Sequence, residues 1–198
     1  MFSGIIEHKA KILKKEDGIF QVENTFKDPL VLGQSIAHDG ACMTLTKIEN
    51  EYYEFFVMQE SLSVTNLCDK KKGDFFNVER SLKLSDRIDG HLVTGHVDGV
   101  GIVVGKEYKE DGSCLLSISY PNEFFPYIVK KGSICVNGVS LTVVQVTDMQ
   151  FSVSLIPLTQ DWTNLSDVQI NGSVNLEFDM IAKLVAKQAG NYLQKETK

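Results

Sequence analysis

The chain has 198 residues, enough for one large domain or two domains of about 100 residues each. Hydrophobic residues make up 43% and charged residues 23%, which is ordinary for a soluble globular protein. The formal net charge of -6 argues against a nucleic-acid-binding protein, because such proteins present a basic surface to the phosphates.

The first residues, MFSGIIEHKAK, have no positive leader ahead of an apolar core, so we expect no signal peptide. No apolar run is long enough to predict a transmembrane helix. The four cysteines show no C-x-x-C spacing, and without an export signal we predict reduced thiols in a cytoplasmic protein.

The first half of the chain, residues 1–90, is predicted to be all-β. Short apolar runs recur about every ten residues with turn signals between them, as expected for a small barrel or sandwich. Residues 38–46, HDGACMTLT, form one such strand. Because successive side chains of a strand point to opposite faces, Cys42 and Thr44 are expected to share a face.

The second half repeats the first. Residues 26–81 align without a gap with residues 124–179, so that TNL at 65–67 recurs at 163–165 and NVE at 77–79 recurs as NLE at 175–177. SGIIE at 3–7 also matches TGHVD at 94–98. A period of about 98 residues is far longer than a solenoid unit. We therefore predict two copies of one domain, residues 1–90 and 91–180.

Strand-like runs in the second half occupy residues 99–105, 114–120, 133–147, 151–157 and 173–178. DG and NG pairs mark several turns between them. GKEYKEDGSC, at residues 105–114, predicts a longer hairpin loop than its counterpart in the first half. Short helical turns are expected at 122–129 and 161–165.

The tail, residues 181–198, departs from the repeat and is predicted to be a helix with Asp179 as its N-cap. One face of this helix is formed by Ile181, Leu184, Val185, Gln188, Tyr192 and Leu193. An apolar stripe needs a surface that buries it. That surface is either the chain's own barrel or the helices of other copies.

A polar pair recurs at one place in both halves. Ser140 and Thr142 share a face of the strand VNGVSLTVV and align with Cys42 and Thr44. Such a pair is compatible with a solvent-facing strand, but its recurrence favours a small-molecule site in each half.

Other polar residues also have both a structural and a functional explanation. His96 takes the place of Ile5 in the matching turn, so a group that can carry a proton replaces an apolar one. Lys131 and Asp179 are also explained as an exposed lysine and a helix cap. His91 and His96 lack the acidic or cysteine neighbours of a metal site, so no metal is expected. No phosphate loop is present, which favours a neutral, hydroxylated ligand.

Motifs along the whole chain carry a resemblance to a known family. They are MFSGIIE, GHLVTGHVDG at the junction of the halves, the paired GACMTLT and NGVSLTV, and the closing VNLEFD. Together they resemble riboflavin synthase, α-chain type, and the resemblance is collinear. It implies an all-β fold of two tandem homologous six-stranded Greek-key barrels followed by a C-terminal helix. It also implies a homotrimer formed through that helix. Whether lumazine synthase is a further partner is left open by the sequence.

The resemblance implies a reaction as well. One molecule of 6,7-dimethyl-8-ribityllumazine would transfer a four-carbon unit to a second, giving riboflavin and 5-amino-6-ribitylamino-uracil with no cofactor. Each barrel would bind one lumazine, and the active site would form between the N-barrel of one subunit and the C-barrel of a neighbour.

By resemblance, the N-barrel pocket uses Gly4, Ile5, Ile6, Cys42, Met43, Thr44, Phe56, Val57, Met58, Gln59, Glu60 and Ser61. The C-barrel pocket uses Gly95, His96, Val97, Lys131, Ser140, Leu141, Thr142, Leu155, Ile156, Pro157, Leu158, Thr159 and Gln160. The catalytic candidates are Cys42, His96, Ser140, Thr142 and Asp179. One group must take a proton from the methyl at ring position 7 of one lumazine, and a nucleophile must add at that position of the other. Which residue fills which role is left open.

Three positions depart from the family pattern. Ser3 replaces a usual threonine, Leu158 stands where a polar residue is common, and DWTNL at 161–165 replaces an ERTTL-like run. Two alternatives are a non-catalytic binder of the lumazine-protein type and a flavin-binding barrel of an oxidoreductase. The first class typically loses C-barrel site residues that this chain keeps, and the second needs a nicotinamide domain for which there is no room.

Overall fold

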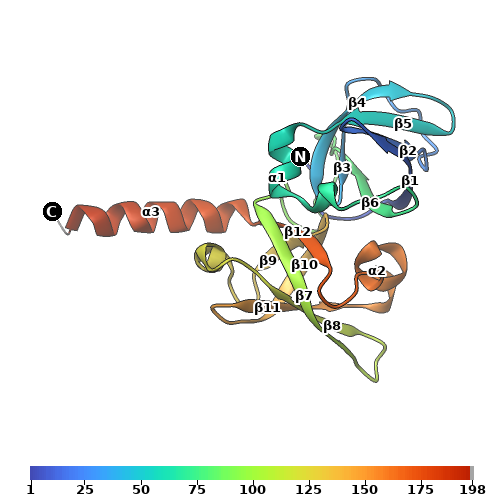
Figure 1. Cartoon of the computed structure of the whole chain (residues 1–198). Helices are drawn as coiled ribbons and strands as arrows, with labels where there is room; N and C mark the ends of the chain where they lie inside the picture. The colour runs from blue at the N-terminus through green and yellow to red at the C-terminus, as the bar shows by residue number, and fades with distance from the viewer. Residues whose placement is uncertain (197–198) are drawn as a thin grey trace.

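The structure is a computed structural model that describes the backbone of residues 1–196 and the side chains of residues 1–192. Figure 1 shows two barrels, one above the other, with a helix extending away from both. The expected place of Leu193 on the helix face lies outside the described side chains. None of the described helices is long and apolar enough to cross a membrane.

The first half closes into an antiparallel six-stranded barrel, in the order β1-β2-β5-β4-β3-β6. Its elements are β1 (His8–Glu16), β2 (Ile19–Glu23), β3 (Ser35–His38), β4 (Ala41–Ile48), β5 (Tyr52–Phe56), α1 (Gln59–Val64), η1 (Asn66–Cys68) and β6 (Phe75–Arg80). We call this unit the N-barrel.

The second half closes into an equivalent barrel, in the order β10-β11-β8-β7-β12-β9. Its elements are β7 (Gly99–Tyr108), β8 (Cys114–Ser119), η2 (Asn122–Tyr127), β9 (Ser133–Val136), β10 (Val139–Val146), β11 (Gln150–Leu155), α2 (Pro157–Trp162), η3 (Asn164–Ser166) and β12 (Ser173–Phe178). We call this unit the C-barrel. Two tandem six-stranded barrels and a C-terminal helix confirm the predicted fold class, and the longer first hairpin of the C-barrel is confirmed too.

Alternation along the strands explains why each barrel closes. On β10, Val139, Leu141 and Val143 are buried, while Ser140 is half-buried and Thr142 exposed. Burying one face of every strand gives each barrel its own apolar core. The predicted shared face of Ser140 and Thr142 is therefore confirmed, and it is the outer face of the barrel.

The two barrels meet through contacts between equivalent residues. Phe2 and Val93 pair reciprocally, N–H to carbonyl, at 2.7 and 3.0 Å. Gly40 and Gly138, both with φ above +80°, leave no room for a side chain. A Cβ on either would lie 2.9 or 2.8 Å from the amide nitrogen of the other. The barrels are thus related by a local pseudo-two-fold axis that passes between these pairs.

Asparagine side chains complete this seam. Asn77 Nδ2 donates to the Asn137 carbonyl, and its equivalent Asn175 Nδ2 donates to the Asp39 carbonyl, each at 2.9 Å. The side-chain oxygen of Asn77 accepts the main-chain N–H of Asn164 at 2.7 Å. The oxygen of Asn175 makes the equivalent bond to residue 66, also at 2.7 Å. Each barrel therefore satisfies buried polar groups of the other.

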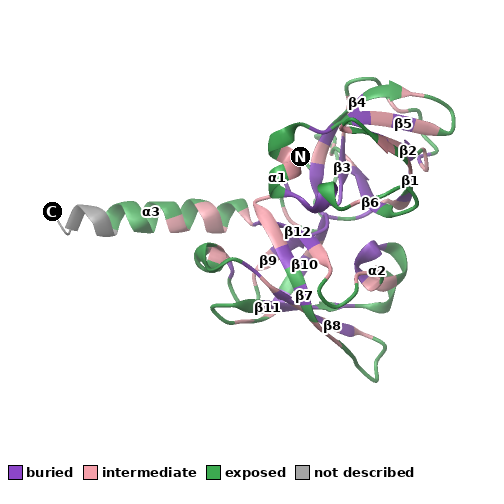
Figure 2. Cartoon of the chain, in the orientation of Figure 1, coloured by how far each residue is buried: buried purple, intermediate pink, exposed green. Residues whose placement is uncertain are grey.

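Helix α3 (Met180–Glu196) begins at the predicted cap: Asp179 Oδ1 accepts the Ile181 N–H at 2.9 Å. Ile181, Leu184 and Val185 are 65%, 54% and 62% exposed, and Figure 2 shows the helix largely green along its described length. The sequence allowed two surfaces that could bury this stripe, the chain's own barrel or the helices of other copies. The chain's own barrel does not bury it.

The N-barrel core contains a histidine. His38 is fully buried, with Nε2 2.9 Å from Tyr53 Oη and its ring centroid 4.1 Å from that of Phe55. Burial lowers the pKa of His38 to about 3, so the ring is neutral at neutral pH. Val136 and Phe151 occupy the equivalent positions of the C-barrel, which lacks this titrating pair.

We predict that the double variant His38→Val, Tyr53→Phe, which copies the C-barrel pair, reduces the acid sensitivity of folding. Unfolding lets His38 bind a proton that the folded state cannot accept, so stability is complete above about pH 6.5 and is lost as pH falls. The loss is up to about 1.4 kcal/mol per pH unit. Urea unfolding at pH 7 and pH 5 measures it, with Tyr53→Phe alone as the control. An unchanged pH dependence in the double variant would contradict the assignment.

Candidate active site

Ser140 lies on the outer face of β10, at the seam between the barrels. Its main-chain N–H donates to the Gly4 carbonyl at 2.8 Å, and its Oγ lies 2.7 Å from Nδ1 of His91. Gly90 leaves the room for this contact, because a Cβ there would be 2.9 Å from the Ser140 Oγ. The hydroxyl of Ser140 is thus held by an imidazole from the linker between the barrels.

The state of His91 decides what this contact can do. Burial lowers the pKa of His91, and the negative charge of Asp179 opposes that shift. The imidazole is therefore neutral at neutral pH, and in the tautomer that carries its proton on Nε2, Nδ1 accepts a hydrogen bond from the Ser140 hydroxyl. Asp179, which also caps α3, is thus a charged group that bears on the His91 imidazole.

His91 was not among the predicted site residues. The repeat identifies residues with an equivalent in the other half, and His91 lies outside the matched segments, which begin at residues 3 and 94. The motif GHLVTGH, whose first histidine is His91, was the signal that could have identified it.

Cys42 occupies the position on β4 that Ser140 occupies on β10. Its main-chain N–H donates to the Gly95 carbonyl at 2.8 Å, and a Cβ on Gly95 would lie 2.6 Å from that of Cys42. Thr44 and Thr142, two residues further along each strand, are exposed. Met43 and Leu141 point into the barrel cores, so only their backbone can line a pocket on the outer face.

The segments after these strands frame the two outer faces. In the N-barrel, Phe56, Met58, Gln59 and Glu60 are exposed, Ser61 is half-buried and Val57 is buried. In the C-barrel, Ile156, Pro157, Leu158 and Lys131 are exposed, Thr159 and Gln160 are half-buried and Leu155 is buried. Trp162, the single tryptophan, is 58% exposed at the end of α2. Leu158, which departs from the family pattern, thus presents an apolar group at the surface.

The segments that precede β1 and β7 cross to the opposite barrels. Gly4 lies against Ser140, and Ile6 belongs to the C-barrel core. Gly95 lies against Cys42, and Val97 packs on the N-barrel core. The sequence grouping placed residues 4–6 with the N-barrel and residues 95–97 with the C-barrel. The structure places them the other way, because both segments run along the seam before their own first strands begin.

Two buried glutamates hold these crossing segments. Glu79 accepts hydrogen bonds from the N–H and hydroxyl of Ser3 and from the Gly4 N–H, at 2.6, 2.8 and 3.0 Å. Glu177 does the same for Thr94 and Gly95, at 2.6, 2.7 and 2.9 Å. Burial raises the pKa of both carboxyls, and the hydrogen bonds oppose it. Ser3 therefore makes the same contacts with Glu79 as its equivalent Thr94 makes with Glu177. The recurring NVE and NLE motifs were the available signal for this pair.

The predicted catalytic residues fall into two groups in one chain. Ser140, Asp179 and the newly identified His91 form one group, with Thr142 beside it on β10. Cys42 and His96 form the other group. His96 is exposed on the turn that follows Gly95, and Gly95 lies against Cys42. No cluster of three or more histidines, cysteines or acids suited to a metal occurs among the described residues. A cavity of about 760 Å³ lies between the N-barrel and the linker, and Ile5 is the predicted site residue among its lining.

Comparison with known proteins agrees with this arrangement. The Lumazine binding domain family matches the chain twice, over residues 3–81 and 94–179. The crystal structure of LumP complexed with riboflavin superposes with a TM-score of 0.80 at 22% identity, covering 90% of this chain and 99% of that one. LumP complexed with 6,7-dimethyl-8-(1'-D-ribityl) lumazine gives 0.77 at 22% identity, covering 89% and 98%. The class is therefore that of tandem lumazine-binding barrels.

Sequence relatives identify the family within this class. Riboflavin synthase of Escherichia coli (strain K12) is 36% identical over 185 residues, covering 90% of this chain and 87% of that protein. Riboflavin synthase of Chlamydia muridarum (strain MoPn / Nigg) is 39% identical over 191 residues, covering 93% and 92%. The chain belongs to the riboflavin synthase family.

The coupling of Asp179 to His91 gives a test of the site. Asp179→Asn keeps an N-cap residue on α3 but removes the charge, so we expect the pKa of His91, already below 6.5, to fall further. Histidine NMR titration measures the shift. His8, which lies edge-on against Phe26 in the N-barrel, serves as the internal control. A His91 pKa that rises or stays the same would contradict the proposed electrostatic contact.

Proposed function

We propose that the chain catalyses the riboflavin synthase reaction. Two molecules of 6,7-dimethyl-8-ribityllumazine would be converted into riboflavin and 5-amino-6-ribitylamino-uracil by transfer of four carbons. The observation that carries this proposal is the pair of equivalent outer faces, Cys42 with Thr44 and Ser140 with Thr142. Two like faces suit a reaction whose two substrates are the same molecule, and membership of the riboflavin synthase family supports it.

In this proposal each pocket combines a strand of one barrel with the crossing segment of the other. The N-barrel pocket uses residues 42–44 and 56–61 with Gly95, His96 and Val97. The C-barrel pocket uses residues 140–142 and 155–160, Lys131 and residues 4–6. The close packing of Gly4 on Ser140 and of Gly95 on Cys42 supports the assignment.

The active site is proposed to form between the N-barrel of one subunit and the C-barrel of the next. The exposure of Thr44, Met58, Thr142 and Ile156 means that a flat ligand on either face would keep one side in water. Apposing the two faces from different copies would exclude that water and stack the two substrates. The exposed stripe of α3 supports assembly through the helices, for which the proposal is a homotrimer. All four cysteines are free, which is compatible with a reducing cytoplasm.

The Ser140–His91 contact supports a role for Ser140 as nucleophile. Its oxygen would add to ring position 7 of the lumazine in the C-barrel pocket, while its proton passes to Nδ1 of His91 and the displaced π-electron pair moves into the ring system. The other lumazine would lose a proton from its position-7 methyl to a base, and the resulting carbanion, delocalised over the ring, would attack the activated partner. Holding the two rings face to face would supply much of the acceleration.

A non-catalytic binder of the lumazine-protein type is the second candidate. The crossing segments and outer faces would serve such a protein equally well, but the Ser140–His91 contact is a feature that binding alone does not need. Mixing the purified protein with 6,7-dimethyl-8-ribityllumazine separates the two functions. Growth of the riboflavin absorption band supports the enzyme. Tight fluorescent binding without riboflavin would replace the proposal with the binder.

We predict that Ser140→Ala lowers turnover by about 100-fold or more, the range found when an acid–base or nucleophilic group is lost. It should cost only about 1 kcal/mol of stability, because one half-exposed hydrogen bond is lost. Steady-state assays and urea unfolding measure the two effects.

Ser117→Ala, on β8, is the matched control and should leave turnover unchanged. Cys42→Ala tests the equivalent position, which has no imidazole partner among the described residues, and should reduce turnover less than Ser140→Ala. Normal turnover in Ser140→Ala would remove this residue from the mechanism.

A further inference from the structure

Helix α3 makes a direct contact with the turn that carries His96. Lys183, one turn into the helix, donates to Asp98 Oδ1 at 2.9 Å and to Oδ2 at 2.8 Å. Both side chains are mostly shielded, at 20% and 23% exposed. An ion pair with two short contacts and little water around it is stronger than a typical surface pair.

This contact closes a clamp at both ends of the turn. Glu177 holds the start, through the main-chain N–H groups of Thr94 and Gly95. The next residue, Phe178, donates its N–H to Asp98 Oδ2 at 2.9 Å and holds the end. The end of β12 and the first turn of α3 therefore fix the turn from 94 to 98. The exposed His96 stands at its centre.

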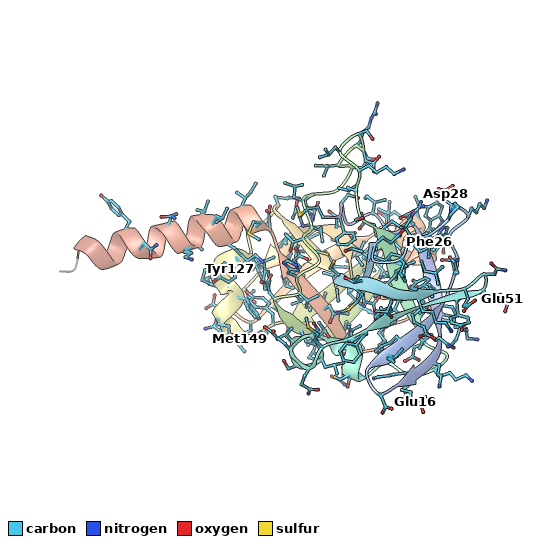
Figure 3. The ribbon with its side chains drawn as sticks, turned by 90° about the horizontal axis from the view of Figure 1, so that it is seen from above. Glu16, Phe26, Asp28, Glu51, Tyr127 and Met149 are labelled. Atoms are coloured by element: carbon cyan, nitrogen blue, oxygen red, sulfur yellow. The ribbon has the colours of Figure 1, made fainter. Side chains whose placement is uncertain are left out.

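The N-barrel builds the same clamp without a helix. Arg80, equivalent to Phe178, donates its main-chain N–H to Glu7 at 2.7 Å and its guanidinium to the same carboxylate at 2.6 Å. Its guanidinium also lies over the ring of Phe26 and donates to Asp28. Phe26 and Asp28 are both labelled in Figure 3. With phenylalanine at position 178, the C-barrel has no cation on the strand, and Lys183 of the helix supplies it.

We propose that Lys183 is a positioning residue for His96, and that it links the placement of α3 to the geometry of the active site. Resting on the proposed function, this gives the helix a second role besides association between copies. Packing of the exposed stripe against other copies fixes the helix, and the ion pair passes that constraint to the turn. Tyr127, at the root of α3 in Figure 3, packs on Phe178 with ring centroids 5.9 Å apart and supports the same junction.

The test compares Lys183→Met with two controls in the full-length protein. Lys183→Arg keeps the ion pair. Lys187→Met makes the same change one turn further along, at an exposed lysine that has no ion pair among the described residues. We expect Lys183→Met to lower kcat roughly tenfold with KM less affected, because His96 is misplaced and not removed. Lys183→Arg and Lys187→Met should stay near the parent, and sedimentation should show one assembly state for all four proteins.

A double-variant cycle and histidine NMR decide whether the effect acts through His96. In a His96→Ala background, Lys183→Met should cause no further loss of kcat. In the parent background, the His96 ring signals should shift while those of His38 do not. Additive losses, or an unmoved His96 signal, would overturn the proposal. The NMR result does not depend on turnover, so a shifted signal in a protein without riboflavin synthase activity would uphold the positioning and reject the proposed function.

Discussion

The buried side-chain amides of Asn77 and Asn175 at the seam between the barrels constrain the rest of the structure, because both bond to the opposite barrel. Asn77 and Asn175 cross the seam in both directions, and their oxygens accept main-chain N–H groups that their own barrels leave free. A buried polar group without a partner costs about 1–3 kcal/mol, so shifting one barrel against the other would break several bonds at once. This fixed placement is what brings Gly4 to Ser140 and Gly95 to Cys42.

Within this near-symmetric frame the two halves differ at chemically important positions. Ser140 has an imidazole partner and its equivalent Cys42 does not, because the linker that carries His91 occurs once. Asp39 forms an ion pair with Lys70 at 2.5 Å, whereas the equivalent positions in the C-barrel hold Asn137 and Val168. Under the proposed function, the two pockets would hold the same molecule and still treat it differently.

Much of the fold could be predicted from the sequence. The strand alternation around Ser140 and the cap at Asp179 follow from local spacing, the repeat follows from matching the two halves of the chain, and the structure confirms all three. The crossing of residues 4–6 and 95–97 could not be predicted, because spacing describes a segment's own strand and not which of two similar barrels it will contact. His91 was missed for a related reason: a comparison of the halves identifies only residues that both halves possess. Glu79 and Glu177 belong to a motif that the sequence repeats. Their role could not be predicted, because it depends on contacts with residues about eighty positions away.

The linker between residues 81 and 98 has a consequence for stoichiometry. Two separate barrels could pair as like with like, giving seams with two serines or two cysteines. Because the two barrels are covalently linked, the N-barrel and the C-barrel of one chain meet at an effective concentration in the millimolar range, which favours this pairing over pairing of like barrels. Every molecule therefore contains one hydroxyl-bearing face and one thiol-bearing face, whatever the protein concentration. An assembly of any number of copies holds the two kinds of face in equal number, so each face of one kind can always find a counterpart of the other.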